Sequence, residues 1–274
     1  MGVQKIFGKN ADYQKFEVLK TNRNKRYKYR EFLVEGVRNI NEAIRNDWQI
    51  SSFIYSGEKK LSSWAYGLLE KVKTTTNFEL TDSLMIDLSK KEETSELLAI
   101  VQMKNEKEDM ASFSGNPVFA LFDRPSNKGN LGTMFRSCDA LGVDGLIITG
   151  HSVDVYDPDV ISSSMGSFFH VPFLRLSDNT EIIRYINDLK NRYPQFNIIG
   201  TSERSQTCLQ DIDLTTPVLF LIGNETDGLS KYYTEISDVM AAIPMSSNSS
   251  ASSINVSCAA TVMFYEANRQ CRRI

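Results

Sequence analysis

The sequence predicts an α/β protein with two successive α/β regions, the second of which contains a mainly parallel sheet covered on both faces. Strand-sized apolar runs alternate with segments of helical periodicity along the 274 residues. A polar stretch without periodicity, residues 103–116, separates the two series of elements. Hydrophobic residues make up 41% of the chain and charged residues 24%, as in an ordinary globular protein, which argues against a disordered chain or a coiled coil.

The first region, residues 1–105, alternates helices with strands. Val37, Ile40 and Ile44 repeat at helical spacing, whereas Phe32-Leu33-Val34 is a short apolar run typical of a strand. Helices are therefore expected at residues 11–20, 37–44, 61–73 and 82–89, and strands at 30–34, 50–55, near 78 and at 97–101. Residues 106–116 are expected to form a linker.

The second region, residues 117–274, repeats the alternation. Val218 to Ile222 is the densest apolar run, and Ile182, Ile186 and Leu189 share one helical face. We expect strands at 118–122, 145–149, 196–199, 218–222 and 239–243, and helices at 130–141, 178–191 and 254–271. Such alternation favours parallel strands, because the connecting helices cover both faces of the sheet.

Several classes of protein are excluded by composition. No apolar run approaches the ~20 residues that span a bilayer, and the N-terminus lacks the apolar core of a secretory signal. We therefore expect a cytoplasmic protein that does not bind a membrane. The chain has four widely spaced cysteines and two histidines, so we expect reduced thiols and no bound metal.

Charge is distributed unevenly along the chain. The net charge is −3, yet residues 1–40 hold ten Lys or Arg and four Asp or Glu, so this stretch carries +6 and the remainder −9. The densest cluster lies between Lys20 and Arg30, where Tyr27 and Tyr29 interleave with the cations. Such a segment can bind the phosphate backbone of a nucleic acid and stack on unpaired bases, or it can be an ordinary solvated basic face. The candidate nucleic-acid-binding residues are Arg23, Lys25, Arg26, Lys28 and Arg30.

Three loops of the second region carry the signal for chemistry, because ligands of parallel sheets bind beyond the carboxyl ends of the strands. The loop after strand 118–122 leads into Asn130-Leu-Gly132 and then Arg136. There Arg136 can serve an anion site, or Asn130 can simply cap the helix and Arg136 lie on the surface.

The other two loops are equally open to two readings. The turn Gly223 to Leu229 follows an apolar strand and either exposes amides to a small molecule or is an ordinary strand-to-helix turn. Ile243-Pro244 is followed by a Ser-rich stretch and then by Ser253 to Ser257. Ser253 can cap the last helix and Asn255 can bind a ligand, or the stretch is a plain linker.

Taken together and in this order, the three segments resemble the motifs of the SpoU/TrmH family of RNA ribose 2′-O-methyltransferases, of the SPOUT class. The resemblance spans about residues 117–274 and rests on Asn130-Leu-Gly132 with Arg136, on Gly223 to Leu229, and on Ile243-Pro244 with Ser253 to Ser257. Residues 10–105 resemble the accessory domain of the ribosomal-RNA members, most clearly at Phe32 to Arg38.

This resemblance implies a fold, a cofactor and an assembly. The catalytic domain, residues 117–274, is expected to be knotted as a trefoil, and residues 1–105 to form a smaller ribosomal-protein-like α/β domain that binds RNA. The implied cofactor is S-adenosylmethionine, and the implied assembly is a homodimer whose active sites draw on both chains. The implied cofactor-binding residues are Gly223, Asn224, Leu229, Ile243, Met245 and Ile254.

The resemblance also implies a reaction, namely attack of a ribose 2′-hydroxyl on the methyl group of the cofactor. Arg136 is the implied activator, which we interpret as a hydrogen-bond donor to the developing alkoxide, because a guanidinium does not readily lose its proton. Asn130, Glu225, Ser253 and Asn255 are expected to orient Arg136 and the ribose.

Two alternatives to this prediction differ in substrate or in activity. The accessory domain favours ribosomal RNA, of the 23S type, over transfer RNA. A non-catalytic RNA-binding protein on the same fold predicts decayed motifs, whereas all three are largely present here. The motifs leave open the target nucleotide and base, naked RNA or an assembled subunit as substrate, and a housekeeping or antibiotic-resistance role.

Overall fold

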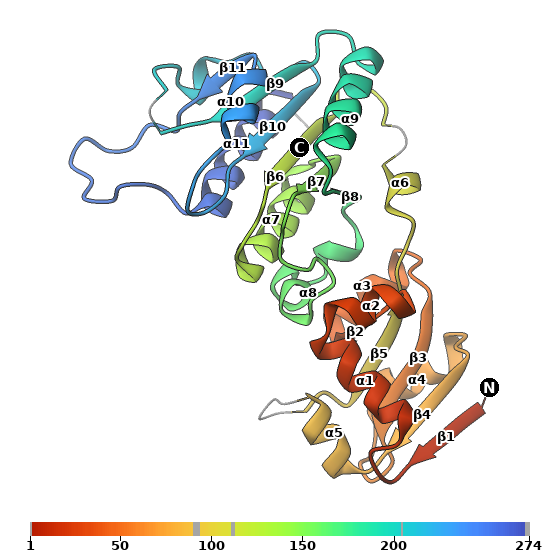
Figure 1. Cartoon of the computed structure of the whole chain (residues 1–274). Helices are drawn as coiled ribbons and strands as arrows, with labels where there is room; N and C mark the ends of the chain where they lie inside the picture. The colour runs from red at the N-terminus through yellow and green to blue at the C-terminus, as the bar shows by residue number, and fades with distance from the viewer. Residues whose placement is uncertain (1, 90–93, 111–112, 204, 272–274) are drawn as a thin grey trace. The chain divides into compact units, whose positions relative to one another are not determined.

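The computed structural model describes residues 2–89, 94–110, 113–203 and 205–271. The chain forms two compact units (Figure 1). Unit 1 comprises Met1–Lys104 together with Tyr156–His170, and unit 2 comprises Asn105–Val155 together with Val171–Ile274. Residues 156–170, which we placed in the second predicted domain, therefore group with the N-terminal unit.

Unit 1 contains a five-stranded mixed sheet. Its strands are β1 (Gly2–Ile6), β2 (Glu31–Glu35), β3 (Ile50–Ser56), β4 (Thr76–Leu80) and β5 (Leu97–Gln102). Its helices are α1 (Ala11–Thr21), α2 (Arg23–Tyr29), α3 (Val37–Arg45), α4 (Ser63–Lys71), α5 (Asp82–Ser89) and α8 (Pro158–Ser164), with a 3-10 turn η1 (Ser167–Phe169). The strand order is β1-β4-β3-β5-β2, and β5 is antiparallel to both of its neighbours.

An aromatic cluster ties the segment Tyr156–His170 into unit 1. The cluster consists of Phe32, Trp48, Tyr156, Phe168 and Phe169, whose neighbouring ring centroids lie 5.0–6.4 Å apart. The indole Nε1 of Trp48 donates a 2.9 Å hydrogen bond to the carbonyl of Phe169. All five side chains are buried, so the segment supplies a large part of the core on this face of the sheet.

Unit 2 contains a six-stranded sheet. Its strands are β6 (Val118–Asp123), β7 (Gly145–Thr149), β8 (Phe173–Leu176), β9 (Asn197–Thr201), β10 (Val218–Ile222) and β11 (Val239–Ala241). Its helices are α6 (Glu106–Asp109), α7 (Lys128–Leu141), α9 (Asn179–Arg192), α10 (Lys231–Ile236) and α11 (Val256–Cys271), with a 3-10 turn η2 (Leu209–Asp211).

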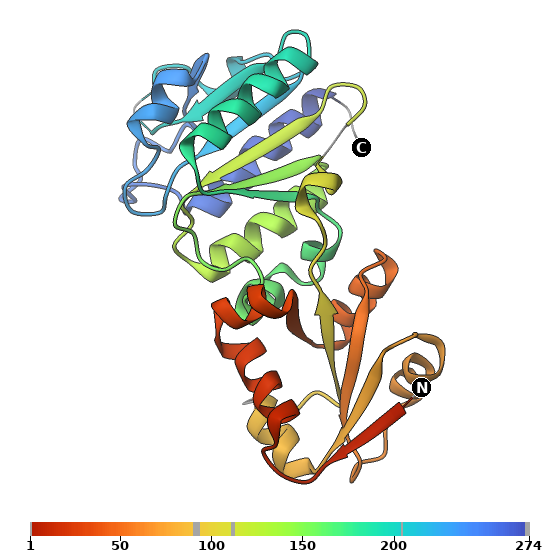
Figure 2. The same ribbon diagram turned by 45° about the vertical axis from the view of Figure 1, so that its right-hand side comes forward.

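The strand order in unit 2 is β11-β9-β10-β6-β7-β8, and every neighbouring pair is parallel. The predicted parallel sheet is therefore confirmed. Helices α9 and α10 pack on one face, where Phe119, Leu121 and Leu219 point (Figure 2). Helices α7 and α11 cover the other face through ring contacts such as Phe135–Phe173 and Phe220–Phe264. Because all strands run the same way, their carboxyl ends share one edge.

Six elements were not predicted: β1, α2, α6, α8, β8 and α10. Each has only four to seven residues, and β1 is also largely exposed, with four of its five residues outside the core. Helix α2 is rich in cations and buries only Arg26, so it has no apolar periodicity to reveal it.

Candidate active site

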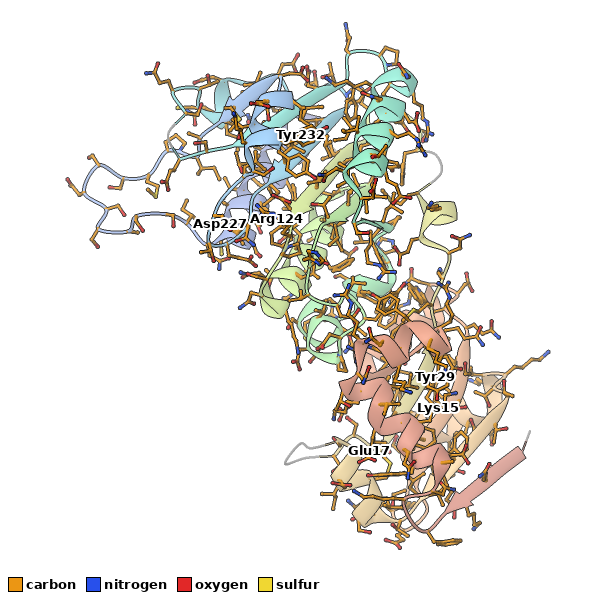
Figure 3. All side chains as sticks on the ribbon, in the orientation of Figure 1. Lys15, Glu17, Tyr29, Arg124, Asp227 and Tyr232 are labelled. Atoms are coloured by element: carbon orange, nitrogen blue, oxygen red, sulfur yellow. The ribbon has the colours of Figure 1, made fainter. Side chains whose placement is uncertain are left out.

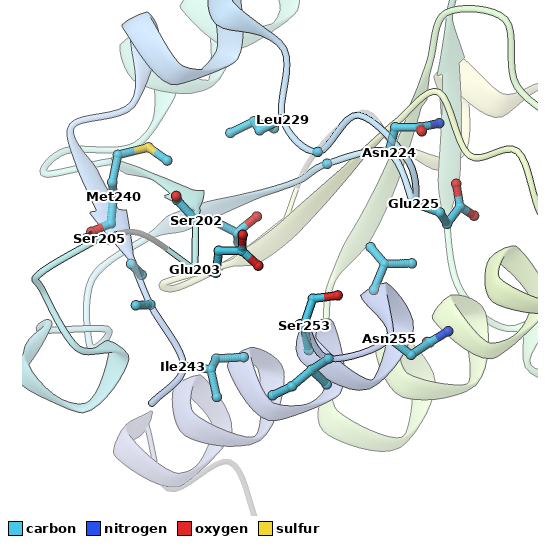
Figure 4. Close-up of a pocket in the computed structure, with 18 of the residues that line it drawn as sticks. Ser202, Glu203, Ser205, Asn224, Glu225, Leu229, Met240, Ile243, Ser253 and Asn255 are labelled. Atoms are coloured by element: carbon cyan, nitrogen blue, oxygen red, sulfur yellow. Dashed lines mark hydrogen bonds between the residues drawn. The ribbon is translucent and has the colours of Figure 1, made fainter. Parts of the chain in front are cut away.

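A cavity of about 960 Å³ opens at the carboxyl edge of the unit 2 sheet (Figure 4). It is lined by the loops after β9, β10 and β11, by the start of α11 and by Asn130 of α7. All six predicted cofactor residues line it, namely Gly223, Asn224, Leu229, Ile243, Met245 and Ile254. Four of the five predicted catalytic residues also line it, namely Asn130, Glu225, Ser253 and Asn255.

The turn after β10 is closed on itself and requires glycine. The amide of Asn224 donates to the carbonyl of Gly228 at 2.9 Å, and the amide of Gly228 donates back at 3.0 Å. A Cβ on Gly223 would lie 2.3 Å from the backbone carbon of Gly228 and 2.4 Å from the nitrogen of Leu229. Gly228 itself has φ +68°, a conformation that other residues rarely adopt.

The side chain of Asn224 joins this turn to the loop after β6. Its Oδ1 accepts from the amide of Thr226 at 2.8 Å, and its Nδ2 donates to the carbonyl of Arg124 at 2.7 Å. The half-buried side chain of Asn224 thereby holds the two loops together.

Glu225 is the centre of a hydrogen-bond network between the same two loops. Its carboxylate accepts from the amide and hydroxyl of Ser126 at 3.0 and 2.9 Å, and from the amide of Asn127 at 3.2 Å. It also accepts from Nδ2 of Asn130 at 3.2 Å. Partial burial opposes ionisation, but the hydrogen bonds from Ser126 and Asn130 outweigh it, and the pKa of Glu225 is lowered.

Asn130 and Asn255 connect the network to the last helix. Nδ2 of Asn255 donates to Oδ1 of Asn130 at 3.2 Å, and the hydroxyl of Ser257 donates to the carbonyl of Asn130 at 2.9 Å. Oδ1 of Asn255 accepts from the amides of Ser257 and Cys258 at the start of α11. Carboxylate, amide and helix terminus thus form one chain of contacts.

The helix caps differ from the ones we considered. Asn127, not Asn130, caps α7, and it accepts a hydrogen bond from the amide of Asn130 at 3.0 Å. Asn255, not Ser253, supplies the side-chain oxygen at the start of α11. Asn130 is therefore inside the helix, where its side chain is free to take part in the Glu225 network.

Arg136 is the predicted catalytic residue that does not line the cavity of its own chain. It lies on α7 with an exposed side chain, between the buried residues Phe135 and Ser137. Ser253 is exposed as well, but it lines the cavity.

One wall of the cavity was not predicted. Thr201, Ser202, Glu203, Ser205 and Cys208 line it after β9. The signal that could have found them is the strand rule itself, because 196–199 was a predicted strand beside 218–222 and its carboxyl end must reach the same edge.

Four of the predicted RNA-binding residues, on α2 and at Arg30 just after it, are exposed or half-buried. Arg23 and Lys28 are exposed, Lys25 is half-buried, and the exposed Arg30 donates to the carbonyl of Lys104 at 3.2 Å. Tyr29 is exposed and lies 5.2 Å below the ammonium of Lys15 (Figure 3).

The prediction that Arg26 binds RNA is corrected by its position in the structure. Its side chain is only 2% exposed and donates to the carbonyls of Leu19 and Lys20. Its guanidinium lies 3.5 Å from the carboxylate of Asp157. Arg26 therefore holds α2 in place inside unit 1 and has no surface to offer to RNA.

No helix in the described part of the chain has the length and apolar character needed to cross a membrane. No group of three or more His, Cys, Asp or Glu side chains in the same residues is arranged to hold a metal ion.

Comparison with known proteins assigns both parts of the chain. The model of the SpoU rRNA Methylase family matches residues 117–265, and that of the SpoU L30e-like domain matches residues 10–99. The chain belongs to the SpoU rRNA methylase family.

Curated relatives cover nearly the whole chain. The 23S rRNA (uridine(2479)-2′-O)-methyltransferase of Streptomyces viridochromogenes is 39% identical over 97% of this chain and 92% of its own. RlmP of Bacillus subtilis, a 23S rRNA (guanosine(2553)-2′-O)-methyltransferase, is 25% identical over 94% of this chain and 96% of its own.

A solved structure shows the same fold. The SpoU methyltransferase AviRb from Streptomyces viridochromogenes, in complex with AdoMet, superimposes with a TM-score of 0.89 at 40% identity. The match covers 95% of this chain and 98% of that one.

Proposed function

We propose that the protein transfers a methyl group from S-adenosylmethionine to a ribose 2′-hydroxyl of 23S ribosomal RNA. The observation that carries the proposal is the Glu225–Asn130–Asn255 network at the mouth of a cavity that the three family motifs enclose. The 23S rRNA specificity of two relatives that align over nearly the whole chain supports the substrate. A ribosomal-RNA substrate also implies a cytoplasmic location.

The cavity fits the cofactor in size and in chemistry. Its volume of about 960 Å³ lies in the range of small-molecule sites. Apolar side chains such as Leu229, Ile243 and Ile254 suit an adenosine, and the carboxylates of Glu203 and Asp227 suit a cation. At Gly223 the backbone of Gly228 and Leu229 is so close that no side chain fits. Main-chain groups of this turn are therefore the natural partners of the adenine.

The residues of the Glu225–Asn130–Asn255 network would position the ribose. S-adenosylmethionine supplies a methyl group on a positively charged sulfur. The ionised Glu225 holds Asn130, and Asn130 is also held by Asn255, so both amides have one orientation. Amides fixed in this way can position a ribose hydroxyl without rearranging during the reaction.

Arg136 is proposed to stabilise the developing alkoxide from the neighbouring protomer of a homodimer. Its exposed position on α7 and its absence from the cavity of its own chain support this arrangement. The adjoining helix α11 exposes Val262 and Tyr265, 41% and 53% accessible, which suit a contact between protomers. Light scattering of the purified protein is expected to give twice the 31.0 kDa chain mass.

The domain roles follow from the same proposal. Residues 1–105, joined through 106–116 to the catalytic residues 117–274, would bind RNA mainly through Arg23, Lys25, Lys28 and Arg30 of the α2 surface. The trefoil knot is part of this proposal for the catalytic domain.

The test is a labelling experiment. The purified protein is incubated with radiolabelled S-adenosylmethionine and, separately, with unmodified 23S rRNA and transfer RNA, and each RNA is digested to nucleosides. A labelled 2′-O-methylnucleoside from 23S rRNA alone is expected and identifies the base. Label in transfer RNA, or label on a base instead of the ribose, contradicts the proposal.

The alternative that the protein has lost its catalytic activity is tested in parallel. Calorimetry measures binding of S-adenosylmethionine to the same preparation. If neither RNA, nor ribosomal subunits that lack the modification, are labelled and no cofactor binds, the protein is a non-catalytic RNA-binding member of the family.

A further inference from the structure

Among the described residues that line the cavity, the charged side chains are all acidic, although the proposed substrate is a polyanion. Its described lining side chains include the carboxylates of Glu203, Glu225 and Asp227 but no Lys, Arg or His. Those carboxylates suit a cationic cofactor and repel the phosphates that flank a target ribose. A cation close to the turn after β10 would offset this repulsion and attract the RNA backbone to the cavity.

Arg124 is a cation at this position. It follows the last residue of β6, and its carbonyl accepts the 2.7 Å hydrogen bond from Asn224 of the turn. Its side chain lies beside that of Asp227 from the same turn (Figure 3). Arg124 thus joins the loop that leads to Asn130 with the loop that carries Glu225.

The side chain of Arg124 is held in place along its whole length. Nε and Nη2 donate to the two carboxylate oxygens of Asp123 at 3.1–3.2 Å, and Asp123 is buried and accepts from the hydroxyl of Thr149 at 3.1 Å. The aliphatic stem crosses Gly150, where a Cβ would lie 2.6 Å from Cγ of Arg124.

The backbone of Arg124 has a strained conformation. Its φ is +48°, in the left-handed region that non-glycine residues seldom occupy. Strain of this kind persists where the surroundings enforce it, and it gathers at functional sites. The side chain nevertheless remains 39% exposed, and within the described structure Nη1 has no hydrogen bond in the protein.

We propose that Arg124 binds an RNA backbone phosphate next to the target ribose, with Asp123 and Gly150 holding the guanidinium in position. Because Asp123 occupies one edge of the guanidinium, the other edge is left for the phosphate, and Arg favours such planar, two-pronged recognition. The inference rests on the proposed function, since it assumes that RNA approaches this cavity.

The test measures binding of unmodified, in-vitro-transcribed 23S rRNA at a series of salt concentrations from about 50 to 200 mM. Arg124→Gln alone would leave the carboxylate of Asp123 buried without its partner, which can destabilise the fold. The variant Asp123→Asn/Arg124→Gln removes both members of the pair. Arg124→Lys keeps the charge, and Arg184→Gln removes an exposed arginine from α9 as the matched control.

The double variant is expected to bind RNA about tenfold more weakly, with the slope of log affinity against log salt reduced by about one, the value for one lost phosphate contact. Arg124→Lys and Arg184→Gln are expected to keep the wild-type slope. Calorimetry is expected to show cofactor affinity within about twofold of wild type for all of them.

Three results would overturn the inference. An unchanged salt slope in the double variant excludes a phosphate contact. An equal change in Arg184→Gln reduces the effect to general charge, and weaker cofactor binding with normal RNA binding makes Arg124 a support of the cavity only. If the salt slope depends on Arg124 but the wild-type protein methylates no RNA, the proposed function is contradicted, whereas the contact between Arg124 and an RNA phosphate still stands.

Discussion

The cavity of unit 2 and the α2 surface of unit 1 are built on different principles. In the cavity, polar groups bind one another: Glu225 accepts four hydrogen bonds, and Asn130 is held from both sides. On α2, Arg23 and Lys28 are exposed, and Arg26 is the buried cation. The cavity therefore depends on shape, so single atoms matter there, whereas the α2 surface depends on the number of charges.

The largest effect is expected where shape is most constrained. Gly223→Ala places a methyl group within 2.3–2.8 Å of the backbone of Gly228 and Leu229, so the turn must move. Overpacking of this kind costs up to about 3 kcal/mol, so cofactor affinity measured by calorimetry should fall by up to about a hundredfold. Gly67→Ala is the control, since nothing lies within 4 Å of its Cβ in helix α4, and cofactor affinity there should not change.

Arg136→Ala should affect catalysis alone. Loss of one donor to the developing charge lowers the rate of methyl transfer by about a hundredfold or more. Because Arg136 does not line the cavity of its own chain, cofactor affinity should stay at the wild-type value. Single-turnover transfer to 23S rRNA measures the rate, and a variant with unchanged turnover would remove Arg136 from the mechanism.

Neutralising the α2 surface should act gradually. Arg23→Gln, Lys25→Gln and Lys28→Gln combined should weaken binding of 23S rRNA about tenfold and lower the salt slope by about one. Each single change should have a fraction of that effect, unlike a change in the cavity. The fold should survive, because these side chains are not in the core. If the combined variant binds with wild-type affinity and slope, RNA does not contact α2.

The smallest effect concerns pH. Glu225 has a lowered pKa in the folded protein, so its ionised form stabilises the fold above the unfolded value of about 4.3, and this contribution is lost as pH falls through the folded pKa. Wild type should exceed Glu225→Gln in stability by at most about 1 kcal/mol at neutral pH. Melting curves should show that the gap closes below about pH 4; a gap that is constant with pH would mean that charge on Glu225 is not involved.

Much of the fold was predictable because both units follow hydrophobic patterns with a clear period. The five predicted strands of the second region appear in the sheet of unit 2, and parallel pairing brings the three motif loops to one edge. Strand β8, Phe-Leu-Arg-Leu, was too short to stand out, and the loop after β9 contains no motif.

Individual side chains were harder to place, because their partners lie far away in the chain. Arg26 is next to exposed cations in sequence, but it is neutralised by Asp157, more than a hundred residues later. The caps were misplaced because Asn127, Asn130, Ser253 and Asn255 are all good capping residues, and only the folded loops decide which of them bonds to an amide.

The segment Tyr156–His170 has a consequence for anyone who exchanges or isolates parts of this enzyme. The N-terminal module is not one continuous stretch of gene, since its aromatic cluster takes Tyr156, Phe168 and Phe169 from within the catalytic family match. A fragment cut at residue 105 would expose Phe32 and Trp48 and lose the counter-charge of Arg26. Chimaeras between relatives should therefore exchange both stretches together.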